Sequence, residues 1–144
     1  MRNLSISAAF AALAIISTMT AHAADNTFGK IFIKAAIAEV NGQPFPDLEL
    51  DATVKDVKKR TRKFVLADSE SEADYLLVVV ERRAVAVSGQ PASKTVLATL
   101  SIRDGATWKP AAKLQSGVRN VIWGVAADQV IKQAEKWAKE NSGK

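Results

Sequence analysis

A run of six apolar residues, Tyr75 to Val80 (YLLVVV), constrains the fold more than any other segment of this chain. Three of the six are β-branched valines, and a polar stretch, Asp68 to Asp74, comes directly before them. A short β-branched run beside a turn signal is typical of a strand in the middle of a sheet, buried on both faces. The sequence therefore predicts a central strand here, and the pattern continues to Val87.

Alternation of apolar and polar residues predicts the other strands. The turn pairs Asn41-Gly42 and Asp104-Gly105 mark chain reversals after two of them. Pro110 restricts its strand to an edge of the sheet, because proline has no backbone N–H to donate. In chain order, the further strands are expected over residues 31–40, 64–66, 95–103 and 107–114.

Two segments have the period of a helix. The first is capped by Asp47 or Asp51, whose side-chain oxygen can accept free backbone N–H groups. Its narrow apolar stripe faces away from a stripe of lysines and arginines. The stripe consists of Leu50, Val54, Val57 and Thr61. The second helix, from about residue 120 to 140, has a wide apolar face that includes Trp123 and Trp137.

The expected order of elements is β-α-β-β-β-(β)-α, which belongs to the α+β class. We expect a two-layer sandwich, with two helices on one face of a four- or five-stranded, mostly antiparallel sheet. The other face of that sheet is then left uncovered, and its alternating residues are expected to be Lys34, Thr95, Thr99, Ser101 and Arg103, mixed with small residues.

The N-terminal segment has the pattern of an export signal. A weakly positive start is followed by an apolar run, Ile6 to Ile16, and by the small-residue cleavage pattern Ala21-His22-Ala23. The run is too short to span a membrane, which takes about 20 residues. We expect a signal peptide over residues 1–23, a single mature domain over 24–144 with no transmembrane anchor, and a periplasmic location, with secretion as the alternative.

The mature domain lacks the residues that most catalytic and metal sites require. The chain has no cysteine, and its one histidine, His22, lies in the segment that is expected to be removed. This excludes Ser-His-Asp and Cys-His catalysis and histidine or thiolate metal sites. No glycine-rich phosphate loop is present. We expect no enzyme activity, no catalytic or metal-binding residue and no cofactor; a hydrolase using carboxylates alone remains a minor alternative.

Charged segments offer candidate surfaces for binding. Six lysines and arginines lie between Lys55 and Lys63, followed by four carboxylates between Asp68 and Asp74. Blocks of opposite sign usually form solvated surfaces, and an exported protein rarely meets nucleic acid, so we expect no nucleic-acid partner. The basic stripe could bind an acidic partner, while the carboxylates lack the spacing of a calcium loop.

The connection between the two longest strands is the preferred contact candidate. Residues 88–93 (SGQPAS) read as a mobile loop, because Gly89 and Pro91 interrupt strand pairing. Arg82 and Arg83 lie at its base, and Trp108, after a turn, is a further candidate for exposure. The predicted contact residues are Arg82, Arg83, Ser88, Gly89, Gln90, Pro91 and Trp108. The basic helix stripe and the uncovered sheet face remain open as alternative surfaces.

One segment of the sequence, with the elements that follow it, resembles a known group of domains. Ala73-Asp74-Tyr75 and the apolar run to Val80, then a strand ending at Asp104-Gly105 and a C-terminal helix, are similar to small bacterial envelope domains. These are the N-terminal α/β domains of TolB-like proteins and of the curli secretion lipoprotein family. The resemblance covers about residues 30–140. The chain departs from it in having no lipobox cysteine, no propeller and no pore-forming hairpins, and no catalytic residue carries over.

Together these patterns predict a non-enzymatic binding or assembly module of the cell envelope. Its partner is expected to be another envelope protein or polymer, and an acidic one would suit the basic residues. The alternative is an inhibitor or immunity-type protein that blocks an exported hydrolase.

Overall fold

A five-stranded mixed sheet forms one layer of the protein in the computed structural model, which describes residues 27–117, 119 and 122–142. The strand order is β4-β1-β5-β6-β7, so the predicted central strand, β5, lies in the middle. Strand β1 is parallel to both neighbours, whereas β5, β6 and β7 are antiparallel. The strands are β1 (Lys30–Ala35), β4 (Val65–Leu66), β5 (Tyr75–Val87), β6 (Gln90–Asp104) and β7 (Thr107–Gln115).

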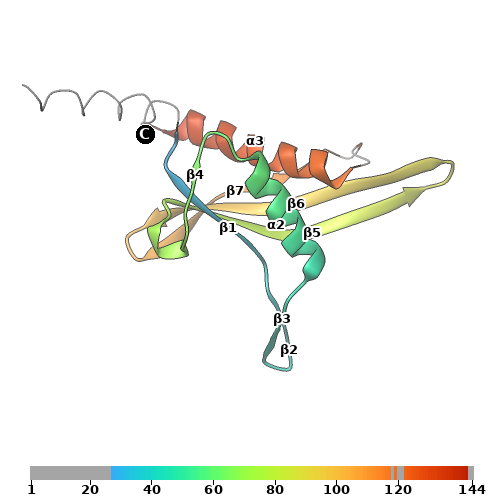
Figure 1. Cartoon of the computed structure of the whole chain (residues 1–144), viewed down its shortest axis with the longest axis horizontal. Coiled ribbons are helices and arrows are strands. Elements are labelled where there is room, and N and C mark those ends of the chain that lie inside the picture. Colours follow the sequence, from blue (N-terminus) through green and yellow to red (C-terminus); the bar gives the residue numbers. More distant parts are fainter. Residues whose placement is uncertain (1–26, 118, 120–121, 143–144) are drawn as a thin grey trace, which may run out of the picture.

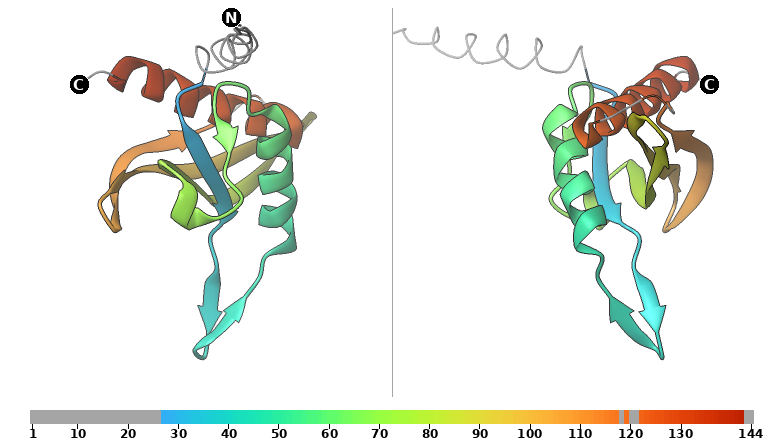
Figure 2. Two further views of the ribbon diagram at one scale, coloured as in Figure 1. Left: turned by 60° about the vertical axis from the view of Figure 1, so that its left-hand side comes forward. Right: turned by 90° about the vertical axis from the view of Figure 1, so that its right-hand side faces the viewer.

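Two helices, α2 (Leu48–Arg60) and α3 (Trp123–Asn141), pack against one face of this sheet and against each other, as predicted (Figures 1 and 2). We call this the covered face and the opposite one the open face. Asp47 is the N-cap of α2, and its Oδ1 accepts hydrogen bonds from the backbone N–H groups of Glu49 (2.9 Å) and Leu50 (3.2 Å). The α+β sandwich is therefore confirmed.

The hydrophobic core lies between the sheet and the helices. Leu77 and Val79 of β5 point into it and have no exposed surface. Val57 of α2 and Ile131 of α3 meet them from the other layer and are equally buried. The predicted burial of β5 on both faces is wrong beyond its first residues: Val78 is half-buried and Val80 is 44% exposed, because no helix covers the open face.

A small hairpin between β1 and α2 was not predicted as a separate unit. The expected strand 31–40 divides into β1 and β2 (Ala38–Val40), and β2 pairs with β3 (Gln43–Phe45). Asn41 and Gly42 form the predicted turn, with φ angles of 53° and 76°, the left-handed values that a tight two-residue hairpin turn requires. The hairpin projects away from the sheet (Figures 1 and 2).

The expected loop over residues 88–93 is also corrected. Strands β5 and β6 are joined by a two-residue turn, Ser88-Gly89, and Gln90 and Pro91 already belong to β6. Gly89 takes the positive φ of the turn, 77°, and the pairing shifts register close to Pro91. Proline is tolerated at such an irregularity because a ladder hydrogen bond is already missing. The two strands therefore form one long arm with a tight tip (Figure 1).

Smaller differences concern element boundaries. The polar stretch before β5 contains one short 3₁₀ turn, η2 (Glu70–Glu72). Thr61, predicted on the apolar stripe of α2, is its C-cap instead.

Within the part of the chain that is described, no helix is long and apolar enough to cross a membrane. The predicted signal peptide lies outside the described residues.

Candidate functional site

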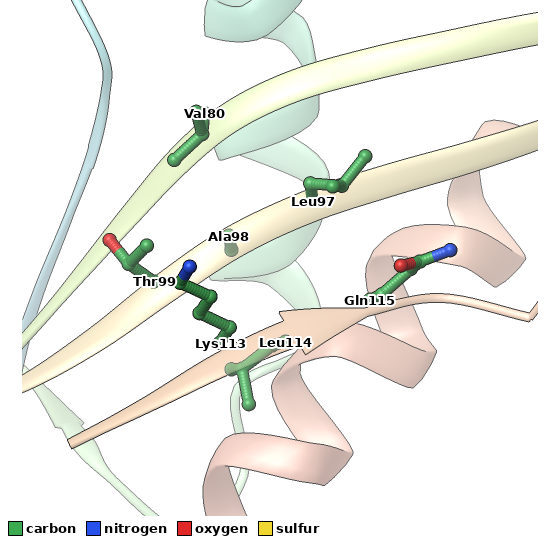
Figure 3. Close-up of a pocket in the computed structure, with 7 residues that line it drawn as sticks. All are labelled: Val80, Leu97, Ala98, Thr99, Lys113, Leu114 and Gln115. Carbon is green, nitrogen blue, oxygen red and sulfur yellow. The ribbon is translucent and has the colours of Figure 1, made fainter.

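The open face contains a shallow groove of about 310 Å³ between β5, β6 and β7. Its exposed floor is apolar, made by Val80 and Leu97, and Thr99, Lys113 and Gln115 stand around it (Figure 3). Register explains this grouping. Thr99 pairs with Lys113 and Leu97 with Gln115, so these side chains share one face, while the buried Ala98 and Leu114 belong to the covered face.

One end of the open face is closed by η2. The carboxylate of Glu70 accepts from Lys34 Nζ at 2.9 Å and from Trp108 Nε1 at 3.0 Å. The guanidinium of Arg103 donates to the backbone oxygens of Glu70 (2.6 Å) and Ala73 (2.7 Å) and lies 4.3 Å from the centre of the Trp108 ring. These contacts fix η2 over the ends of β1, β6 and β7.

The same contacts set the ionisation of Glu70. The hydrogen bond from Lys34 is the main cause that holds the pKa of Glu70 below its usual value. Partial burial acts against this shift, and the charge of Lys34, the Trp108 hydrogen bond and the charge of Arg103 support it. Trp108 is half-buried, because its indole N–H binds Glu70 and its ring packs against Arg103. Its ring is therefore less available for contact with a partner than the sequence suggested.

Arg82 and Arg83 point to opposite faces of the sheet, so they do not form one basic patch at the foot of the β5–β6 arm. Arg82 lies on the covered face, where Nη1 donates to the Glu49 backbone oxygen (3.0 Å) and to Thr53 Oγ1 (3.3 Å). Its guanidinium carbon lies 3.8 Å from the centre of the Trp123 ring, and its side chain is only 15% exposed. Arg82 thus ties β5 to the starts of both helices.

Arg83 lies on the open face and makes two hydrogen bonds of 3.0 Å to the Glu81 carboxylate. Ser88, Gly89, Gln90 and Pro91 are exposed at the tip of the arm. Ser88 lies five positions beyond Arg83 along an extended strand, a distance of about 17 Å at 3.3–3.4 Å per residue. The structure therefore does not bring the seven predicted contact residues together: Arg82 is internal, Trp108 belongs to the η2 network, and the tip stands apart.

The described residues contain no group of three or more His, Cys, Asp or Glu side chains placed to hold a metal ion. Of the carboxylates between Asp68 and Asp74, Glu70 is bound as above, and Asp74 Oδ2 accepts from the Lys30 backbone N–H at 3.0 Å. Two members of this acidic stretch thus serve as hydrogen-bond acceptors that fasten the turn to the sheet.

A second exposed apolar surface lies on and beside the β2–β3 hairpin, and sequence reasoning missed it. Its large side chains are Ile37, Val40, Phe45 and Leu48, with exposures of 64%, 53%, 64% and 80%. A signal was present: apolar residues flank the Asn41-Gly42 turn on both sides, which is typical of a separate β-hairpin.

Comparison of the sequence with protein-family models and with curated proteins finds no match.

Proposed function

We propose that this chain is an exported, periplasmic module without enzyme activity that binds another component of the cell envelope through the open face of its sheet. The observation that carries this proposal is the placement of both helices on one face. The other face is left with a groove of apolar floor and polar rim, which is the usual anatomy of a contact surface. The resemblance to envelope α/β domains supports the same setting.

The groove is better suited to contact with a macromolecule than to chemistry. A site for acid–base catalysis needs titratable groups gathered in a cleft. Here the lining side chains on the open face are Val80, Leu97, Thr99, Lys113 and Gln115, and Lys113 is the only titratable group among them. A sheet surface with one cation and two apolar side chains can bind a partner but holds no pair of groups that could exchange a proton.

Site-specific photo-crosslinking in living cells tests this proposal. A photoreactive amino acid in place of Thr99, on the open face, should give a defined adduct with another envelope component. The matched control replaces Lys132, which is exposed on the outer side of α3, and should give none. Equal adducts at both positions, or none at Thr99, would overturn the proposal.

Export is tested separately. N-terminal sequencing of the protein from the periplasmic fraction should begin at Ala24 or Asp25, because Ala21 and Ala23 supply the small side chains that processing requires. A cytoplasmic product that keeps Met1 would contradict the periplasmic location.

The second candidate function is inhibition of an exported hydrolase, and the projecting β2–β3 hairpin favours it. A tight hairpin with exposed apolar side chains could enter an enzyme cleft. In this case a photoreactive residue at Gln43, beside the turn, should give the adduct, and the one at Thr99 should not.

A further inference from the structure

The β2–β3 hairpin presents more exposed apolar surface than a hairpin of its size can bury by itself. All six of its strand residues are exposed. Ala38 pairs with Phe45 and Val40 with Gln43, so Val40 and Phe45 lie diagonally on one face. An isolated two-stranded hairpin is marginally stable in water, and contiguous exposed apolar side chains usually mark a contact surface.

The region around the hairpin also differs in charge from the rest of the protein. Residues 35–54 contain four carboxylates and no lysine or arginine, whereas all 20 lysines and arginines of the chain lie elsewhere. The four are Glu39, Asp47, Glu49 and Asp51. Glu39 lies on the hairpin, on the face opposite Val40 and Phe45, and the other three lie at the start of α2, so the acidic charge is at the base of the hairpin.

The open face has the opposite character. Strand alternation places five cations on it and one strand carboxylate, Glu81, and Glu70 of η2 lies over the same face. Two of the cations form ion pairs with these carboxylates, and the net charge of the face remains positive. The cations are Lys30, Lys34, Arg83, Arg103 and Lys113. Its groove offers an apolar floor, Val80 and Leu97, with Lys113 at the rim. The apolar floor complements the apolar face of the hairpin, and the net positive charge of the open face is opposite to the acidic charge at the base of the hairpin.

We infer that the β2–β3 hairpin of one copy docks into the open-face groove of a second copy of this chain. Val40 and Phe45 cover the apolar floor of the groove, and the acidic residues at the base of the hairpin face the cations of the sheet. The inference rests on the proposed role of the open face as a binding surface, and it adds a second copy of this chain as an occupant beside the other envelope component.

The two surfaces are different, so the contact is head-to-tail. Such a contact leaves one hairpin and one groove free at the ends, and assembly can continue into larger species instead of stopping at a symmetric dimer. The attraction between the acidic residues at the base of the hairpin and the basic face should weaken with added salt, because exposed charges are screened.

Analytical ultracentrifugation of the purified mature protein, from dilute to concentrated solution, tests the inference. The expected result is self-association that rises with concentration beyond a dimer and falls with salt. Phe45→Glu in the hairpin and Val80→Lys in the groove should each weaken it by roughly tenfold or more, the usual loss when a central interface contact is destroyed. Val125→Glu, at an exposed position of α3, should leave it unchanged.

Mixing the two variants gives the decisive measurement. Phe45→Glu keeps an intact groove, and Val80→Lys keeps an intact hairpin. A head-to-tail contact predicts that each variant alone is monomeric and that the mixture forms a 1:1 heterodimer. Contact between two hairpins, or between two open faces, predicts no heterodimer and would overturn the inference. Thermal melts check that the variants are folded, and Thr99→Lys replaces Val80→Lys if the latter has a lowered Tm.

A wild-type protein that stays monomeric at every concentration would also overturn the inference. If Thr99 then still crosslinks to a different envelope component in cells, the proposed function stands without it. If the protein is monomeric and no adduct forms at Thr99, both fail.

Discussion

The two faces of the sheet use the same strands but have different surroundings. On β5, Leu77 and Val79 of the covered face are completely buried, whereas the open face carries the half-buried Val78 and, at the bulge that follows, Val80 at 44% exposure. All four residues are apolar and adjacent in the sequence. The difference shows that burial was decided by where the helices dock and not by the hydrophobicity of the strand.

The largest expected effect comes from placing a charge on either face of β5. Leu77→Asp buries a carboxylate without a partner and should cost several kcal/mol, in a domain whose total free energy of unfolding is about 5–15 kcal/mol. Val78→Asp, one residue away on the open face, should cost on the order of 1 kcal/mol, because its carboxylate can reach water. Urea unfolding of both variants measures the difference, and equal losses would contradict the assignment of the two faces.

A similar comparison applies to the neighbouring arginines. Arg82→Met removes the hydrogen bonds to Glu49 and Thr53 and the contact with Trp123, and should lower the free energy of unfolding by about 1–3 kcal/mol. Arg83→Met removes an exposed ion pair and should cost at most about 0.5 kcal/mol. Chemical unfolding followed by tryptophan fluorescence would show the contrast. A larger loss for Arg83→Met would mean that the faces of the two residues are reversed.

The η2 network should make stability depend on pH. The pKa of Glu70 is lowered in the folded state, chiefly by the Lys34 hydrogen bond, so its contribution is present above its ordinary pKa and is lost as pH falls through the lowered value. Glu70 is partly exposed, and the effect should be less than about 1 kcal/mol. Glu70→Gln should remove this part of the acid-side slope in unfolding curves, and an unchanged slope would show that another carboxylate is responsible.

The smallest effect is expected on the basic side of α2. Lys58→Ala, in the exposed stripe, should change stability by at most about 0.5 kcal/mol. Its sequence neighbour Val57 is completely buried, and Val57→Ala should cost about 2 kcal/mol. Thermal melts of the two variants test whether α2 buries Val57 and exposes Lys58, as its periodicity predicts. Similar Tm values for the two variants would contradict this assignment.

Much of the fold could be predicted because local chemistry and tertiary structure agree. Asp47 caps α2 as an aspartate before an apolar stripe should. The YLLVVV run forms the central strand, and Pro110 lies on the edge strand β7. In each case a backbone preference and the final position require the same conformation.

The contact residues were predicted less well. Arg82 and Arg83 are adjacent, and sequence proximity suggested one basic patch, yet neighbouring residues of a strand point to opposite faces. The tip of the arm was expected to be a loop because Gly89 and Pro91 both disfavour pairing. In the structure a two-residue turn absorbs Gly89 and an irregular pairing accommodates Pro91.

By itself the sequence determined the α+β class, the central position of β5, the N-cap of α2 and the turns after β2 and β6, since each depends on local residue patterns. Alternation in β1 and β6 also indicated the open face, because the predicted residues Lys34, Thr99, Ser101 and Arg103 lie on it. Only the tertiary structure decided that Val80 is exposed, that Arg82 is internal and that Lys113 lies beside Val80 and Leu97. These features depend on how elements far apart in the chain pack together. A strand that is apolar on both faces does not carry the information about which face the helices will cover.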